Sequence, residues 1–140
     1  MYEKKNVTYV LTILEAIEKI YIYTRGIQTA EVFYEQNDQL EFNACQTLLL
    51  VIGEESKKID ENLKSEHQKI PWNLISGMRN RIAHDYRSID PNITFDIVRN
   101  YLPPLKSALI LMLEKIDFEE DFLRRIVDTN FYRHLKYLVK

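Results

Sequence analysis

Apolar residues recur every three or four positions along most of this chain, which is the spacing of amphipathic helices rather than of strands. With only three glycines and four prolines among 140 residues, little interrupts that pattern. The first apolar stripe predicts a helix that ends near Arg25-Gly26, where glycine can adopt the left-handed conformation that stops a helix. A short helix over about 29–34 should follow. The first stripe consists of Val7, Val10, Leu11, Leu14, Ile17 and Tyr21.

The next pattern predicts a long helix from about Gln39 to beyond Ile59. Its apolar residues occupy two faces, so this helix should be buried on two sides and lie at the centre of the fold. Gly53 interrupts it at a cost of roughly 1 kcal/mol relative to alanine, which indicates that another backbone crosses closely there. The two faces are formed by Leu48, Val51, Ile52, Glu55 and Ile59 and by Phe42, Cys45 and Leu49.

Polar residues and prolines predict the boundaries that follow. The polar segment 64–69 should be a connection between two helices. Pro71 suits the first turn of a helix that continues through Trp72 to about His84. Asp90-Pro91 should begin the helix after that one, since both residue types favour the start of a helix.

The final third of the chain is predicted to hold one interrupted helix and a tail. Pro103-Pro104 should kink or divide the helix before it resumes over 105–116. The tail, 117–140, is charged and amphipathic, and its acidic run Glu119-Glu120-Asp121 suits a solvated first helical turn. Basic residues later in the tail could extend an RNA-binding surface or contact an acidic partner, although a solvated helix face is the simpler interpretation. The fold class expected is all-α, an up-and-down bundle.

Composition fits one soluble domain, with 46% apolar and 29% charged residues. A chain of this size buries roughly 70% of its unfolded surface and needs no disulfide or metal to stabilise it. The single cysteine, Cys45, lies in an apolar run and should be buried rather than reactive, which favours a reducing, cytoplasmic compartment. Charged residues interrupt the N-terminal apolar stretch at helical intervals, so it is not a secretory leader, and no segment should span a membrane.

The formal net charge of −2 excludes the strongly basic character of many nucleic-acid-binding proteins, so any RNA site must be local. The residues best suited to such a site lie in the run 79–86, RNRIAHDY. At 100° per residue, Arg79 lies at the edge of an apolar stripe, whereas His84 projects almost opposite, in line with Asn80 and next to Gly77.

Two interpretations of this run are open from spacing alone. A histidine in the last turn of a helix can simply interact with the helix dipole, and Arg79 can pair with a carboxylate such as Glu54 or Glu55. Alternatively, an arginine, a histidine and a tyrosine can neutralise, protonate and contact a phosphodiester. A zinc site is not expected, because His67 and His134 are isolated in sequence from each other and from His84.

The run resembles a family motif in which an arginine is followed, after four residues, by a histidine, one further residue and a tyrosine. This is the motif of HEPN-domain toxins of the HepT type, and here it corresponds to Arg79, His84 and Tyr86. The segment 51–57 resembles the glycine-glutamate segment of the family, and Ile70-Pro71-Trp72 resembles its approach to the motif. The similarity covers roughly 7–116. We therefore expect one domain, with a HEPN-like helical bundle over 1–116 and a C-terminal helical extension over 117–140.

The resemblance implies a bundle of four to six helices that forms a homodimer and cleaves RNA as an endoribonuclease without a metal ion or other cofactor. It assigns catalytic roles to Arg79 and His84. A twofold axis near His84 would bring two copies of both residues to one cleft, where one imidazole could act as base and the other as acid. Asn80 is expected to support them by orienting the scissile group or the imidazole, and the products would be a 2′,3′-cyclic phosphate and a 5′-hydroxyl.

The resemblance also implies partners. Transfer RNA is the substrate suggested by family analogy, and no DNA or membrane binding is expected. The antitoxin would be a minimal nucleotidyltransferase that attaches AMP groups to Tyr86, and it would neutralise the toxin by this modification, by binding to it, or by both. A tyrosine that merely packs at a helix end is the alternative for Tyr86. The chain lacks the glycine-serine loop and paired aspartates of such a transferase. Two rival functions are a non-catalytic helical module that binds a nucleotide or a nucleotidyltransferase, and a purely structural helical dimer.

Overall fold

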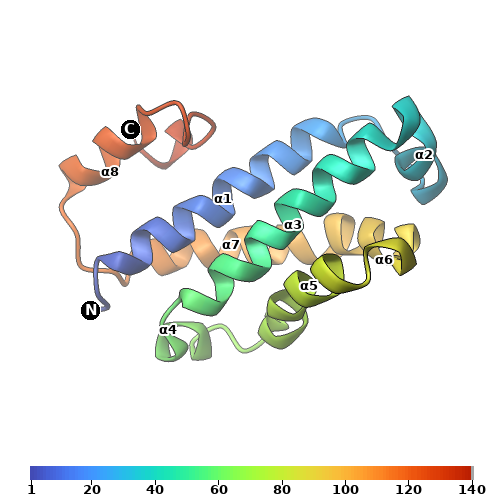
Figure 1. Cartoon of the computed structure of the whole chain (residues 1–140). Helices are drawn as coiled ribbons and strands as arrows, with labels where there is room; N and C mark the ends of the chain where they lie inside the picture. The colour runs from blue at the N-terminus through green and yellow to red at the C-terminus, as the bar shows by residue number, and fades with distance from the viewer. Residues whose placement is uncertain (140) are drawn as a thin grey trace.

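Four helices, α1, α3, α5 and α7, run alternately up and down and form the body of the molecule (Figure 1). The structure is a computed structural model that describes residues 1–139, and within them no strand is found apart from a single bridge between Tyr2 and Ile116. The predicted all-α bundle is confirmed. The helices are α1 (Lys5–Tyr23), α2 (Ala30–Glu35), α3 (Leu40–Lys58), α4 (Glu61–Ser65), α5 (Trp72–His84), α6 (Pro91–Asp96), α7 (Leu102–Leu113) and α8 (Glu120–Val127).

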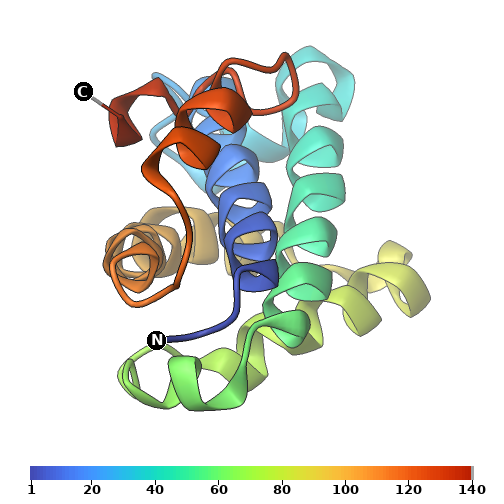
Figure 2. The same cartoon turned by 90° about the vertical axis from the view of Figure 1, so that its left-hand side faces the viewer.

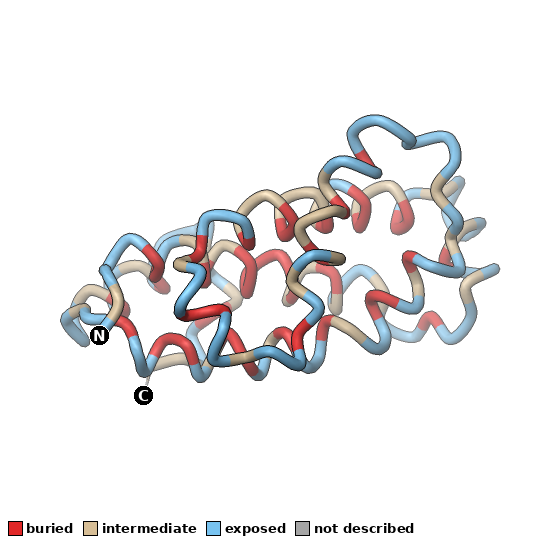
Figure 3. The backbone as a smooth tube through the Cα atoms, turned by 90° about the horizontal axis from the view of Figure 1, so that it is seen from below, coloured by how far each residue is buried: buried red, intermediate tan, exposed pale blue. Residues whose placement is uncertain are grey.

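The buried residues recur along the sides of these helices that face one another, and they are the red segments of the backbone tube in Figure 3. Helix α1 contacts α3 and α7, and α3 contacts α5 on its other side, which confirms the two-sided burial predicted for α3. Gly26 has the positive φ of 80° that was expected just beyond the first helix. Cys45 is fully buried in this core.

Helix α3 ends slightly earlier than predicted, at Lys58, because Ile59 is already extended. The backbone N–H of the next residue, Asp60, donates to the Asn6 side chain of α1, and the Asp60 carboxylate accepts from Asn62 N at the start of α4. These two contacts give the chain a sharp turn at this point, since they satisfy backbone donors that a longer helix would have used.

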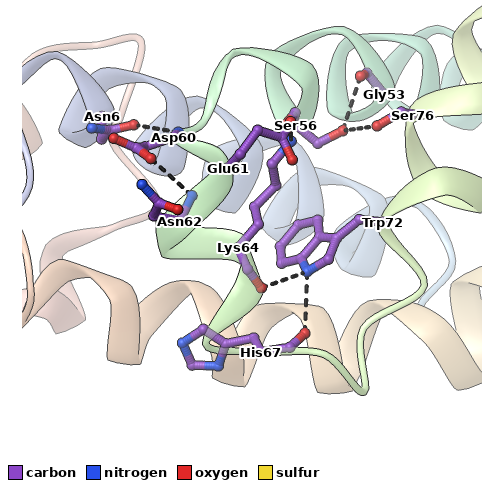
Figure 4. A network of polar contacts seen from close by, with 10 residues as sticks. All are labelled: Asn6, Gly53, Ser56, Asp60, Glu61, Asn62, Lys64, His67, Trp72 and Ser76. Carbon is purple, nitrogen blue, oxygen red and sulfur yellow. Dashed lines mark hydrogen bonds and ion pairs between the residues drawn. The ribbon is translucent and has the colours of Figure 1, made fainter.

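The polar segment 64–69, predicted to be a connection, begins with the last residues of the short helix α4. Lys64 and Ser65 belong to α4, and Lys64 is only 5% exposed. Its ammonium donates to the Ser56 carbonyl and pairs with Glu61, while its own carbonyl accepts from the Trp72 indole (Figure 4). A lysine can be buried in this way because its charge and donors are satisfied. The network fixes the start of α5 against the end of α3.

The interruption expected at Pro103-Pro104 lies before the prolines instead. Helix α7 contains both prolines in its first turn, where a missing N–H costs no hydrogen bond. A wide π turn over Ile97–Tyr101 precedes them, and it connects α7 to α6, whose first turn is capped by Asp90 as predicted. The π turn gives the proline rings the room that an ordinary α-helical turn would deny them.

The C-terminal tail folds back along α1, as the orange and red segments show in Figures 1 and 2. Its first turn carries the predicted acidic residues, which pair one turn later with Arg124 and Arg125. His134 turns inward, where its backbone N–H and its ring contact the buried Glu15 carboxylate. Part of the basic character of the tail is therefore used within the molecule.

No helix of residues 1–139 is long and apolar enough to cross a membrane. Within the same residues, no cluster of three or more His, Cys, Asp or Glu side chains is arranged to hold a metal ion.

Candidate functional site

Helix α5 crosses α3 with their backbones in near contact at Gly53. A Cβ atom added there would lie 2.9 Å from the Ile75 carbonyl oxygen and 3.0 Å from Arg79 N, distances that real Cβ atoms essentially avoid. The predicted close crossing at this glycine is therefore confirmed. The Arg79 side chain projects from α5 at this crossing, so the packing of the two helices determines its position.

The Arg79 guanidinium is held by a carboxylate of α3. Its Nε lies 3.1 Å from Glu54 Oε2, whereas Glu55 pairs with Lys58 instead. The Arg79 side chain is 39% exposed and that of Glu54 is 44% exposed, so this ion pair is open to solvent and contributes little to stability. The ion pair orients the guanidinium through Nε, so the other N–H groups of the guanidinium can donate to a ligand.

Arg79, Asn80 and His84 form one accessible surface. Arg79 Nη1 lies 3.4 Å from Asn80 Oδ1, so the long arginine side chain reaches toward the row formed by Asn80 and His84. Both of these residues are exposed, and within residues 1–139 the His84 imidazole has no hydrogen-bond or ion-pair partner. Gly77, one turn earlier, would admit a side chain with nothing within 4 Å. The surface could therefore accept a phosphate group and exchange a proton with it.

Tyr86 follows immediately after α5, in a 3₁₀ turn over Tyr86–Ser88. Its side chain is 48% exposed, and its hydroxyl donates to the Asn43 side chain of α3. The tyrosine is thus not packed in the core at the helix end. Asn43 was not identified from the sequence, because no local pattern connects two residues that are 43 positions apart.

A cavity of about 230 Å³ lies on the side of α5 that faces α3 and α6, and no pattern in the sequence predicted it. It is lined by side chains of α3, α5 and α6, including Gln46, Met78 and Thr94. Arg81 and Asp85, which belong to the same run as Arg79 and His84, lie at its edge.

The model of one protein family, described as ribonuclease HepT-like, matches residues 13–112, which include α5 and all of the surface described above. The chain belongs to the HepT-like ribonuclease family. It is therefore a ribonuclease-family protein of the HEPN type, as the motif in α5 indicated. The match ends before the tail, 117–140.

Individual relatives agree with this assignment. A protein of Thermococcus cleftensis named "Probable ribonuclease HepT" is 32% identical over 104 residues, which are 74% of this chain and 92% of that protein. A protein of Methanocaldococcus jannaschii named "Gamma-glutamylcyclotransferase and putative RNase" is 28% identical over 109 residues, 78% of this chain and 48% of that protein. No solved structure matches the chain. The HepT-like assignment thus rests on sequence relatives, and the geometry of the site comes from this structure.

Proposed function

We propose that this protein is a metal-independent endoribonuclease that cleaves RNA at a site formed by two copies of the chain, with transfer RNA as the substrate that fits the family. The observation that carries the proposal is the accessible surface of Arg79, Asn80 and His84. Its imidazole is exposed and has no partner within residues 1–139, while its guanidinium is already oriented by Glu54. A buried or paired histidine would support a structural role instead.

The chemistry needs a base, an acid and positive charge. The ribose 2′-hydroxyl loses its proton to one imidazole and attacks the adjacent phosphorus; the bond from phosphorus to the 5′-oxygen breaks, and a second imidazole protonates that oxygen. The products are a 2′,3′-cyclic phosphate and a 5′-hydroxyl. The Arg79 guanidinium would stabilise the charge that develops on the phosphorane oxygens, and Asn80 would orient the phosphate or the imidazole.

A single chain supplies only one suitable imidazole, so the mechanism requires a partner copy. His67 and His134 lie in other parts of the fold, and His134 is engaged by Glu15. The open space beside Gly77 supports close approach of a second chain to the same face of α5. A twofold axis there would bring both His84 residues to one cleft and supply the acid and the base by symmetry.

Tyr86 is the proposed point of regulation in a cytoplasmic toxin-antitoxin pair. Tyr86 is about half exposed, and its hydroxyl would attack the α-phosphorus of ATP bound to a partner nucleotidyltransferase, releasing pyrophosphate and giving up its proton. The AMP group would add bulk and negative charge next to the RNA site, where it would compete for Arg79. Mass spectrometry after incubation with that partner and ATP should detect AMP on Tyr86 and none on the Tyr86→Phe variant; an unmodified Tyr86 would contradict the switch.

The cleavage proposal is tested by incubating the protein with RNA in EDTA. His84→Ala and Arg79→Ala should each lower the rate by at least a hundredfold, because base, acid or charge stabilisation is removed. His67→Ala and Arg124→Ala are matched controls outside the site and should cleave like the parent. A binding module without catalysis would give no cleavage that depends on His84, and equal rates for His84→Ala and the parent would overturn the assignment.

A further inference from the structure

The cavity beside α5 has apolar walls and a polar end. Leu49, Met78, Ile82 and Ile97 contribute apolar surface from three sides. At about 230 Å³ the cavity is smaller than the sites that enclose drug-sized ligands, so it suits a single flat ring system. A ring with polar groups at its edge also needs hydrogen-bonding partners in the wall of its site. The wall of this cavity contains such groups.

A buried amide lies in this wall. Gln46 is 1% exposed, and its Nε2 donates to the Thr94 hydroxyl at 3.2 Å. Its Oε1 accepts no hydrogen bond within residues 1–139. In the same residues, every side-chain oxygen or nitrogen that is fully enclosed has a hydrogen-bond partner. The Gln46 oxygen must therefore reach open space, and the cavity that Gln46 lines provides it. A buried polar group of this kind discriminates strongly between ligands that satisfy it and ligands that do not.

The mouth of the cavity adjoins the RNA-cleaving surface proposed above. At 100° per residue, Arg81 projects about 60° from His84 around α5, and Arg81 also lines the cavity. Arg81 is exposed and forms no ion pair within residues 1–139. Asp85 and Asp90, which also line the cavity, would repel a phosphate from its interior. A ligand that carries a phosphate would therefore bind with its phosphate at Arg81 and its uncharged part inside the cavity.

We propose that this cavity binds one unstacked nucleobase of the RNA substrate, next to the phosphate that is cleaved. The base would lie between the apolar walls, its edge would donate to Gln46 Oε1, and Arg81 would contact its phosphate. Single-stranded RNA is commonly recognised in this way, through a base that is extruded from the stack and read at its edge. The proposal rests on the proposed ribonuclease function, whereas free nucleotides share the same chemistry and allow the cavity to be tested separately.

The first experiment measures binding of the four nucleoside 5′-monophosphates by NMR, without any cleavage. At least one of them should shift the Gln46 side-chain amide and Thr94 resonances. Ser88→Trp and Ile93→Trp place a large ring at the edge of the cavity and should weaken this binding at least tenfold, while Ser107→Trp on α7 should not. If no nucleotide perturbs Gln46 and Thr94, or if Trp variants that fold normally bind nucleotide as tightly as the parent, the cavity is not a nucleobase site.

The second experiment identifies the source of the base. An RNA oligonucleotide carrying one abasic nucleotide is cleaved with the lesion moved along the positions beside the cut. The parent should lose at least tenfold in rate at one position, and Ser88→Trp should be insensitive to the lesion everywhere. Nucleotide binding without any positional effect assigns the cavity to free nucleotides and overturns the RNA proposal; nucleotide binding without any His84-dependent cleavage overturns the proposed ribonuclease while the cavity assignment stands.

Discussion

His84 and His134 have opposite surroundings. At the scale of single residues, this difference distinguishes a histidine that can transfer protons from one that stabilises the fold. His84 is exposed and has no side-chain partner within residues 1–139, whereas His134 Nδ1 lies 2.5 Å from a Glu15 oxygen that is almost fully buried. Residue spacing alone could not tell them apart, because the partner of His134 lies 119 positions away. Family resemblance singled out His84, and its exposure is what makes a role in proton transfer physically reasonable.

Glu54 is expected to position Arg79 rather than to stabilise the fold. Glu54→Gln removes the charge that orients the guanidinium, so we expect kcat for RNA cleavage to fall about tenfold while KM changes little. The free energy of unfolding should change by less than about 1 kcal/mol, because the ion pair is exposed. Glu55→Gln is the matched control, since Glu55 pairs with Lys58 away from the site. Equal kcat values for the two variants would show that Glu54 has no positioning role.

The buried Cys45 thiol should make the free energy of unfolding decrease at alkaline pH. Burial raises the pKa of the Cys45 thiol to about 12 from the ordinary value of 9.0, with a smaller contribution from the charge of Glu41. Above pH 9 the unfolded chain loses this proton while the folded chain keeps it. The free energy of unfolding should therefore fall with rising pH, by up to about 1.4 kcal/mol per pH unit.

Urea denaturation at pH 8, 9 and 10 measures this decrease. Cys45→Ala should be less stable than the parent throughout, because it leaves a small cavity, but its stability should fall less steeply between pH 9 and 10. Parallel curves for the two proteins would contradict the burial effect. The range stops at pH 10 because burial also raises the pKa of Tyr21, to about 12, and tyrosine ionisation then contributes as well.

At the scale of helices, the crossing of α3 and α5 is the contact that positions the site. Periodicity and one glycine were sufficient to predict it, because a glycine inside a buried helix indicates close packing. Helix α4 and the π turn before α7 could not be predicted in the same way. Helix α4 depends on the buried Lys64, which contacts Ser56 and Glu61 only in the folded chain. The π turn depends on how the backbone before two prolines adjusts to their rings.

Two alanine substitutions test that crossing. Gly53→Ala places a Cβ against the backbone of α5, so the helices must separate, and we expect a loss of about 1–3 kcal/mol in the free energy of unfolding together with weaker RNA cleavage. Gly77→Ala meets no atom of its own chain within 4 Å, so helix propensity should stabilise the folded chain by up to about 1 kcal/mol. Thermal and urea denaturation compare the two variants. A Gly53→Ala protein as stable as the parent would mean that α3 and α5 are not in backbone contact.

At the scale of the whole molecule, the tail is a structural cover for α1 rather than part of the site. It lies on the side of the bundle away from α5 in both views of Figures 1 and 2. Its buried residues, Leu123, Val127 and Leu135, complete the core, and Tyr132 and Tyr137 hydrogen-bond to side chains of α1. The amphipathic pattern predicted that the tail is helical, but it could not indicate which surface the tail covers.

His134→Ala should loosen this cover. The buried Glu15 carboxylate would lose one of its two hydrogen bonds, so we expect a loss of about 1–3 kcal/mol in the free energy of unfolding and faster proteolysis within the tail. RNA cleavage at a temperature where the variant remains folded should be unchanged, because the tail does not reach α5. The control is His67→Ala, which should match the parent in both measurements. Loss of cleavage by a folded His134→Ala protein would mean that the tail contributes to the site.

The central claim is that two copies of His84 act in one cleft, and mixed dimers test it most directly. Parent and His84→Ala chains are unfolded together, refolded in different proportions, and assayed for RNA cleavage in EDTA at constant total protein. If each cleft needs both imidazoles, activity falls with the square of the parent fraction, so an equal mixture retains about a quarter of the parent rate. If each chain works alone, the decrease is linear and about half of the rate remains, which would contradict the account.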